Sequence, residues 1–370
     1  MSHKIAIVYD WIDKWGGVER LLLTLHEIFP EADFFSSYYD PKNASWAKQI
    51  NIKTSFIQKF PDFIKKNRKL SVPLYPFAFE SFNFGDYSLV LSVTSSFAKG
   101  IITKPGTKHI CILLTPTRFL WIHPQVYKTN NMLTKPYINY LKKWDNIAAQ
   151  RPDDYICISE TVKKRLLQIH DRTGVVIYPP FDIHHWDKIK KQATRNKKQI
   201  NSKYFLVVSR LEPYKKINLV VETFNKHPKK NLIIIGKGTE LKYLKSIARS
   251  NITFLQDLTD EELATYYQFA QGLIMSQEED FGYVALEAQF FDCPIIAYRK
   301  GGTVETIIEN QTGIFFENQT VDSLTYVLIQ YDKIKKDLKK RTIILGKKQC
   351  ELFSKVKFVS NLTNLLRRYE

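Results

Sequence analysis

The chain has 370 residues, of which 44% are apolar, and 55 Lys and Arg against 37 Asp and Glu give it a formal net charge of +18. This length exceeds what one hydrophobic core usually fills, so two domains are expected. No N-terminal segment reads as a signal peptide, and no apolar stretch approaches the ~20 residues of a membrane-spanning helix, so a cytoplasmic location is expected.

The positive charge attracts phosphates, nucleic acid or an anionic membrane surface. A lysine-rich, solvated surface without a specific partner explains the excess equally well. The lysines are dispersed and no nucleic-acid-binding motif is present, so nucleic acid is not expected as a partner. The scattered cysteines Cys111, Cys157, Cys293 and Cys350 have no metal-ligand spacing and are predicted to be reduced thiols of the core.

Strand-like and helix-like segments alternate along the whole chain, which predicts an α/β fold with parallel sheets covered by helices. In the first half a strand is expected at residues 4–9, then the turn Gly16-Gly17 and an amphipathic helix at 18–29. Further strands are expected at 32–37, 89–93, 109–114 and 155–159, and residues 175–180 close this half.

A polar, lysine-rich stretch without periodicity, residues 187–201, is interpreted as the linker region. Beyond it strands are expected at 204–209, 232–235, 252–255, 272–275 and 294–297, helices at 217–225, 241–248, 261–269 and 283–291, and a helical, basic tail from 322. Two Rossmann-like domains facing across a cleft would follow, with ligands beyond the carboxyl ends of the strands.

The most informative stretch is residues 276–289, in which two carboxylates, Glu279 and Glu287, stand eight positions apart. An apolar strand precedes them, and a turn at Phe281-Gly282 leads into a helix. Such a strand, turn and helix is a common site for phosphates and sugars, because a helix N-terminus offers N–H groups to anions. Glu279 is therefore expected on the loop, and Glu287 in the second turn of the helix.

Two cations follow the first strand of the second half. Arg210 and Lys215 lie on one strand-to-helix connection and suit a diphosphate, since a guanidinium fork and an ammonium both bind phosphate oxygens. Alone, they would equally describe a solvated basic loop. The acidic loop at Glu279 in the same half favours a site.

Together these motifs resemble the family 4 glycosyltransferases, which have the two-domain GT-B fold, and the likeness runs nearly end to end. It rests on residues 8–11, 16–19, 95–100, 115–121, 177–182, 209–215, 279–289 and 301–306, with the Glu279-x7-Glu287 pattern as the hallmark. The residues around this pattern are similar to those of bacterial mannosyltransferases that build O-antigen or capsule chains.

The resemblance implies a role for each matching residue. It places Arg210 and Lys215 on the donor diphosphate, Glu279 beside the donor sugar and Glu287 on the nucleotide ribose. It assigns the donor-binding turn to Asp280, Phe281, Gly282, Tyr283 and Val284, and close backbone approach of donor and acceptor to Gly16 and Gly17.

The implied activity is transfer of a hexose, with retention of configuration and without metal or other cofactor, from a nucleoside-diphosphate sugar to a glycan or lipid-linked saccharide. GDP-mannose or a GDP-6-deoxyhexose is the first expectation for the donor, and the sequence contains no Asp-x-Asp metal motif. The implied domains are 1–185 on the acceptor side and 186–355 for the nucleotide sugar, with a helix at 356–370 that returns to the N-terminal domain.

The chain departs from the family pattern at two positions. Leu114 stands where relatives usually carry His beside the donor's C6 hydroxyl, and Ile122 stands where Asp is common. One hypothesis is that Leu114 packs against the methyl group of a 6-deoxy sugar; the other is that hydroxyl contacts come from elsewhere. These departures also leave open a non-catalytic protein that binds nucleotide sugars or glycans.

Residues 54–70 form a second basic feature, with aromatic residues at Phe56, Phe60 and Phe63 followed by a cationic flank. The spacing suits an amphipathic segment on an anionic membrane surface, and packing of the aromatics in a core explains it equally well. His123, His184 and His185 match no metal-site spacing and are interpreted as structural or surface residues.

Overall fold

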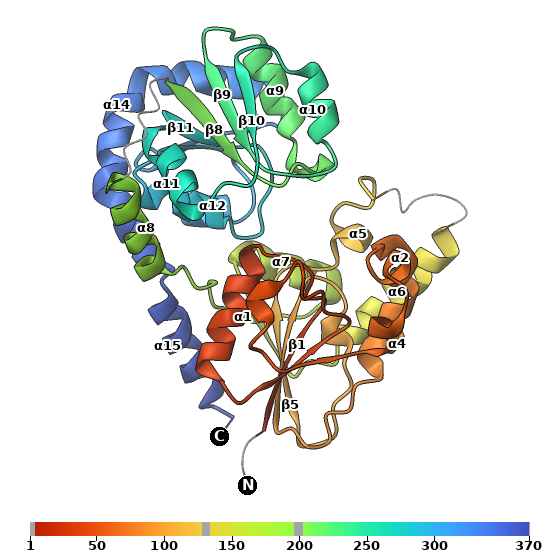
Figure 1. Cartoon of the computed structure of the whole chain (residues 1–370). Coiled ribbons are helices and arrows are strands. Elements are labelled where there is room, and N and C mark those ends of the chain that lie inside the picture. The colour runs from red at the N-terminus through yellow and green to blue at the C-terminus, as the bar shows by residue number, and fades with distance from the viewer. Residues whose placement is uncertain (1–3, 128–133, 196–202, 370) are drawn as a thin grey trace. The chain divides into compact units, whose positions relative to one another are not determined.

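The computed structural model describes residues 4–127, 134–195 and 203–369, which fall into two compact units, Met1–Tyr178 and Pro179–Glu370. Each unit is a parallel β-sheet with helices on both faces (Figure 1). The predicted α/β class is therefore confirmed. Within the described residues, no helix is both long and apolar enough to cross a membrane.

The first unit contains a seven-stranded sheet in the order β3-β2-β1-β4-β5-β6-β7. Its strands are β1 (Ile5–Tyr9), β2 (Asp33–Ser36), β3 (Ile52–Thr54), β4 (Leu89–Thr94), β5 (Lys108–Leu113), β6 (Asp154–Cys157) and β7 (Val175–Val176). Central strands read as continuous apolar runs because both of their faces are covered, and Ala6, Ile7 and Val8 are all fully buried.

Helices cover this sheet on both sides, with α1 on one side of β1 and α4 and α6 on the other (Figure 1). The α-helices are α1 (Gly17–Ile28), α2 (Asp62–Lys65), α3 (Arg68–Ser71), α4 (Tyr75–Glu80), α5 (Arg118–Trp121), α6 (Lys135–Ala148) and α7 (Glu160–His170). Short 3₁₀ turns are η1 (Ser45–Ala47), η2 (Phe56–Lys59), η3 (Val72–Leu74) and η4 (Ala98–Gly100).

The second unit contains a six-stranded sheet in the order β10-β9-β8-β11-β12-β13. Its strands are β8 (Tyr204–Val208), β9 (Asn231–Ile235), β10 (Ile252–Leu255), β11 (Gly272–Met275), β12 (Ile295–Tyr298) and β13 (Gly313–Phe316). Its helices are α8 (Ile183–Arg195), η5 (Pro213–Lys215), α9 (Ile217–Asn225), α10 (Leu241–Ile247), α11 (Asp260–Phe269), α12 (Tyr283–Phe290), α13 (Thr303–Thr306), α14 (Val321–Leu352) and α15 (Lys355–Leu366).

Each sheet reverses its strand order once, between β1 and β4 in the first unit and between β8 and β11 in the second. Ligands of such sheets bind outside the carboxyl ends of the two strands that flank the reversal, because their loops leave in opposite directions and open a crevice. The motif loops after β1, β4, β8 and β11 all begin at these two points.

The predicted linker at 187–201 is wrong as far as the structure describes it. Residues up to Arg195 belong to helix α8, in which Trp186 and Ile189 are buried, and His185 Nε2 lies 2.9 Å from Asp260 Oδ2 of α11. Few apolar residues are enough here, because they repeat at helical spacing. Residues 196–202 lie outside the described part of the chain.

The second unit begins at Pro179, close to the boundary predicted at residue 186. The basic tail is two helices, and Ser354 caps the second by accepting a hydrogen bond from the Lys357 amide. Helix α15 falls within the second unit, and its predicted return to the N-terminal domain stays a prediction. The four cysteines are free and buried, as expected.

Candidate functional site

The reversal point of the second sheet brings together the two loops singled out in the sequence. The loop after β8 carries Arg210 and Lys215, and the loop after β11 carries Glu279. Lys215 Nζ lies 2.6 Å from Glu279 Oε1, and the Gln277 amide donates to the same oxygen at 2.6 Å. The Ser276 hydroxyl donates to the backbone carbonyl of Lys215 at 3.0 Å, so the two loops are joined twice.

The two cations of this site differ in their surroundings. Lys215 is buried and ion-paired, whereas the Arg210 side chain is exposed and has no hydrogen bond or ion pair within the described part of the chain. An exposed guanidinium on the same loop as a fixed ammonium is available to an incoming anion.

The turn after Glu279 leads directly into helix α12. Gly282 adopts the left-handed conformation (φ 93°) at the N-cap, which glycine tolerates without strain. Phe281 is buried with its ring edge against Tyr283, whose hydroxyl donates to Pro180 O at 3.2 Å. The first-turn N–H groups of a helix lack acceptors within the helix, so the start of α12 is suited to an anion or a hydroxyl.

Glu287 lies in the second turn of α12, as expected, and its side chain is buried. The Tyr267 hydroxyl of α11 donates to Glu287 Oε2 at 2.9 Å. This contact fixes the orientation of the carboxylate, and the sequence offered no signal for it, because Tyr267 lies twenty positions away on another helix.

The backbone of Gly301 and Gly302 packs closely against the acidic loop that carries Glu279. The Gly302 amide donates to Glu279 O at 2.7 Å. A side-chain carbon at Gly301 would lie 2.2 Å from Glu279 O, and one at Gly302 would lie 2.5 Å from Phe281 Cα. Only glycine allows this approach of two backbones, so the Gly301-Gly302 motif supports the position of Glu279.

A second pair of glycines, not predicted from the sequence as part of the site, packs closely against the loop that carries Arg210. Gly236 and Gly238 follow β9. A side-chain carbon at Gly236 would lie 1.8 Å from the carbonyl oxygen of Ser209, and one at Gly238 would lie 2.2 Å from that of Leu211. The backbone that carries Arg210 is therefore packed against this Gly-x-Gly loop. Two glycines directly after a predicted strand were the available signal.

The reversal point of the first sheet is organised by a buried carboxylate, that of Asp10. It accepts hydrogen bonds from the Thr94 hydroxyl and from the amides of Ser95, Phe97 and Ala98, each at 2.8 Å. These contacts join the loop after β1 to the loop after β4. Asp10 is thus a structural residue of this loop.

The predicted turn Gly16-Gly17 lies at the start of α1, where Gly16 is the extended N-cap. A side-chain carbon at Gly16 would lie 3.1 Å from Glu19 Oε2, so little room remains beside it. Leu114 is half-buried directly after β5, and its amide donates to Thr94 O at 2.8 Å. The structure thus places Leu114 and Gly16 in the first unit, each after a strand of the same sheet.

A buried ion pair lies under the loops after β4 and β5. Lys99 Nζ is 2.6 Å from Asp145 Oδ1, and both side chains are almost fully buried. Asp145 also accepts from the Thr117 hydroxyl at 2.9 Å and from the Trp121 indole at 2.8 Å. His170 Nε2 lies 3.4 Å from Asp145 Oδ2, and burial lowers the pKa of His170 to about 4.

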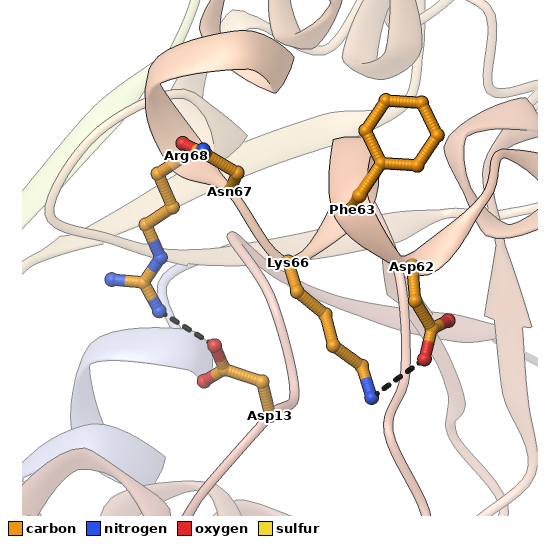
Figure 2. Close-up of a pocket in the computed structure, with 6 residues that line it drawn as sticks. All are labelled: Asp13, Asp62, Phe63, Lys66, Asn67 and Arg68. Carbon is orange, nitrogen blue, oxygen red and sulfur yellow. Dashed lines mark hydrogen bonds and ion pairs between the residues drawn. The ribbon is translucent and has the colours of Figure 1, made fainter.

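An open depression of about 810 Å³ lies beside the loop after β1 (Figure 2). It is lined by Asp13, Asp62, Phe63, Lys66, Asn67 and Arg68. Figure 2 shows the Arg68 guanidinium directed at Asp13, 2.7 Å from Oδ2, and the Lys66 ammonium directed at Asp62, at 2.9 Å. Asp13 Oδ1 is buried without a hydrogen-bond partner among the described residues.

The predicted amphipathic segment at 54–70 is broken. Pro61 separates η2 from α2, and α3 follows as a further short helix. Phe56 and Phe63 are exposed, in accord with a surface role. The cations Lys65 and Lys66 are paired with Asp62, and the side chain of Lys69 lies outside the described part of the structure.

The chain is similar to known glycosyltransferases in part of its sequence and in its fold. Residues 188–349 match the family model of the group 1 glycosyl transferases. An uncharacterized glycosyltransferase of Methanocaldococcus jannaschii is 26% identical over 188 residues, 50% of either chain. A D-inositol 3-phosphate glycosyltransferase of Corynebacterium efficiens is 29% identical over 168 residues, 40% of this chain and 39% of the relative. The chain thus spans half or less of the length of these relatives.

Solved structures match over the whole chain. Anabaena HepE in complex with UDP has a TM-score of 0.72 at 16% identity and covers 99% of this chain and 100% of its own. Sucrose-phosphate synthase of Thermosynechococcus elongatus has a TM-score of 0.74 at 14% identity and covers 99% of each chain. These likenesses confirm the two-domain GT-B fold. Within the second unit, residues 188–349 are similar to the group 1 glycosyl transferases.

Proposed function

We propose that the chain is a retaining, metal-independent glycosyltransferase that moves a hexose from a nucleoside-diphosphate sugar to a glycan or a lipid-linked saccharide. The observation that carries this proposal is the contact of Lys215 with Glu279 at the reversal point of the second sheet, with Arg210 on the same loop as Lys215. Two cations and a helix N-terminus there match a diphosphate, and carboxylates on either side match the hydroxyls of a sugar and a ribose.

The chemistry asks for charge stabilisation above all. When the bond between the sugar and the diphosphate breaks, negative charge collects on the phosphate oxygens and positive character on the sugar ring. Arg210, Lys215 and the start of α12 stabilise the first, and removing one such group typically costs on the order of 10²–10³ in turnover. In this proposal the leaving phosphate takes the proton of the attacking hydroxyl on the same face, which retains the configuration.

The donor is a nucleoside-diphosphate hexose, with GDP-mannose or a GDP-6-deoxyhexose proposed from the resemblance. A UDP-sugar is the competing donor, because the structurally similar Anabaena protein was solved in complex with UDP-glucose. The base makes contacts that none of the motifs encodes, so only ligand binding separates these donors.

The acceptor is proposed to bind at the depression around Asp13 and Arg68. Asp13 Oδ1, buried and without a hydrogen-bond partner among the described residues, suits a hydroxyl donor, and the exposed ring of Phe63 offers an apolar face to a sugar. A lipid-linked acceptor would bring the enzyme to a membrane, for which residues 54–70 supply exposed aromatic side chains, whereas Lys65 and Lys66 are paired with Asp62.

A thermal-shift screen with UDP, GDP, ADP and their sugars tests the donor, since a ligand at 100 times its dissociation constant stabilises the fold by ~2.7 kcal/mol. Slow donor hydrolysis without acceptor, lost in Lys215→Ala and Glu279→Ala, would establish the enzyme. If the donor binds but is not cleaved, whichever acceptors are added, a non-catalytic nucleotide-sugar-binding protein would be favoured instead.

A further inference from the structure

The solvent-facing side of helix α14 exposes more large apolar side chains than is usual for a surface helix. Its other side packs into the second unit through Leu324, Leu328, Tyr331 and Leu338, all buried. The outer side exposes large apolar residues: Tyr326 (64% exposed), Ile329 (48%), Ile343 (54%) and Ile344 (63%). Single exposed apolar residues are common on protein surfaces, but four on one helix face need an explanation.

The same face carries lysines at helical spacing. Lys333, Lys336 and Lys340 follow one another at intervals of three and four residues, and Ile344 and Lys348 continue the row at intervals of four. These lysines are exposed and have no hydrogen bond or ion pair in the part of the chain that the structure describes. Four exposed lysines therefore lie beside four exposed apolar side chains, and the exposed carboxylates of Asp337 and Glu351 on the same helix form no ion pair with them in the described part of the chain.

This arrangement contrasts with residues 54–70. There, Lys65 and Lys66 lie within 3.0 Å of carboxylate oxygens of Asp62, and Arg68 lies 2.7 Å from Asp13. Pairing with nearby carboxylates cancels most of the attraction that these cations would exert on an anionic surface. The four exposed lysines of the row on α14 form no such ion pairs among the described residues, so they keep their attraction for an anionic surface. They also lie on a helix of 32 residues, whereas the cations of residues 54–70 lie on helices of four.

We propose that the outer face of α14 docks on an anionic phospholipid surface. The charge of that surface is complementary to Lys333, Lys336, Lys340 and Lys348, and Ile343 and Ile344 enter the headgroup boundary between the cations. Basic residues that flank exposed apolar side chains on a helix are the usual means of such binding. The proposal does not depend on which sugar the enzyme transfers.

Co-sedimentation with vesicles tests the proposal on the whole chain. Wild type is expected to bind vesicles of phosphatidylglycerol and phosphatidylcholine, to bind pure phosphatidylcholine much less, and to lose binding towards ~0.5 M salt, where charge screening is strong. Each lysine near an anionic surface contributes about fivefold to partitioning, so the variant with all four lysines changed to Gln is expected to lose binding at least a hundredfold.

The matched control changes four other exposed lysines, Lys42, Lys48, Lys242 and Lys245, to Gln, and is expected to retain most of the binding. An equal loss in this control would mean that only net charge matters, which would overturn the proposal. A wild type that stays in the supernatant, or a loss confined to Lys59→Gln with Phe63→Ser, would also overturn it.

The apolar part is tested separately with Ile343→Asn and Ile344→Asn, which keep every charge. A loss of about tenfold or more supports insertion of the isoleucines. Unchanged binding, together with equal binding of duplex RNA, would show a general affinity for polyanions and overturn docking on lipid. Circular dichroism of each variant shows whether α14 and the fold are retained.

Discussion

Lys215 Nζ lies 2.6 Å from Glu279 Oε1, although 64 residues separate the two in the chain. Both side chains are mostly buried, with 8% and 15% of their surfaces exposed. The pair joins the two loops at the reversal point of the sheet, so either residue helps to position the other. In the proposed reaction the lysine is shared between this carboxylate and the donor diphosphate.

This sharing predicts strong coupling between the two residues. Lys215→Ala and Glu279→Ala are each expected to lower donor hydrolysis on the order of 10²–10³-fold, and the double variant is expected to lose much less than the product of the two. Lys226→Ala, at an exposed lysine, serves as the matched control. Multiplicative losses in steady-state kinetics would show that the pair does not act as a unit.

The close approach of Gly302 to the acidic loop predicts the effect of one methyl group. Gly302 has φ −65°, which alanine adopts freely, so Gly302→Ala tests the lack of space alone. The added carbon would lie 2.5 Å from Phe281 Cα, and the loop that carries Glu279 must shift. A displacement of a catalytic group by about 1 Å can lower the rate 10²-fold. Gly302→Ala is therefore expected to lower turnover strongly and the stability of the fold much less.

The matched control for this variant is Gly85→Ala, whose added carbon would meet only the Asn83 side chain. Donor affinity by calorimetry and melting temperature are measured for both. Wild-type kinetics in Gly302→Ala would show that the loop yields to the added carbon, and that the glycine is not needed for the position of Glu279.

Much of the fold could be predicted from the sequence because the sheets are parallel and covered on both faces. Such strands are short apolar runs between turn residues, and β11 (Gly272–Met275) and β10 (Ile252–Leu255) have the bounds that were expected. Edge strands β3 and β13 were missed. β3 reads Ile-Lys-Thr, with too few apolar residues for a signal.

The site was predictable in its chain-local parts only. Arg210, Lys215, Glu279 and Glu287 lie in motifs, and the structure places them on the loops after β8 and β11 and in helix α12. Tyr267 contacts Glu287 from another helix, and such pairs depend on tertiary packing that no spacing reveals. The Lys99–Asp145 pair was missed for the same reason, since 46 residues separate its members.

That buried pair predicts a large stability effect. Asp145→Asn leaves the Lys99 ammonium, 1% exposed, without its charge partner, and such a change typically costs about 3–5 kcal/mol in the free energy of unfolding. Urea denaturation measures the loss. Replacing both residues, as Lys99→Met with Asp145→Leu, is expected to recover part of it, because no buried charge then remains unpaired.

The control is the exposed pair of Lys347 and Asp187, with 50% and 37% of the side chains exposed. Asp187→Asn is expected to change the unfolding free energy by about 1 kcal/mol or less. Equal effects of Asp145→Asn and Asp187→Asn would mean that water reaches the buried pair.

Two buried histidines predict that the fold weakens in mild acid. Burial lowers the pKa of His170 to about 4 and that of His109 to about 3, both from an ordinary value of 6.5. The unfolded chain therefore binds more protons than the folded chain below pH 6.5. Stability is full above that pH and is lost progressively as the pH falls from 6.5 towards 4, and for His109 towards 3.

Urea midpoints between pH 7.5 and 4.5 measure this loss. His170→Gln is expected to flatten the pH dependence, whereas His184→Gln, at an exposed histidine, is expected to leave it unchanged. The same slope in all three proteins would assign the acid sensitivity to other groups, such as paired carboxylates.

The hypothesis that Leu114 packs against the methyl group of a 6-deoxy donor sugar can be tested by ligand binding. A hydroxyl buried against an apolar side chain without a hydrogen bond costs ~1–3 kcal/mol, whereas a methyl group gains contact there. Wild type is therefore expected to bind a 6-deoxyhexose nucleotide about five- to a hundredfold more tightly than its 6-hydroxyl analogue, measured by calorimetry. Leu114→His is expected to reverse this order, because an imidazole can bond to the hydroxyl. Ile102→His, at an exposed position of the same unit, controls for the added ring. If wild type binds the hydroxylated donor equally well or better, Leu114 does not select a 6-deoxy sugar, and the contacts to the sixth carbon come from other residues.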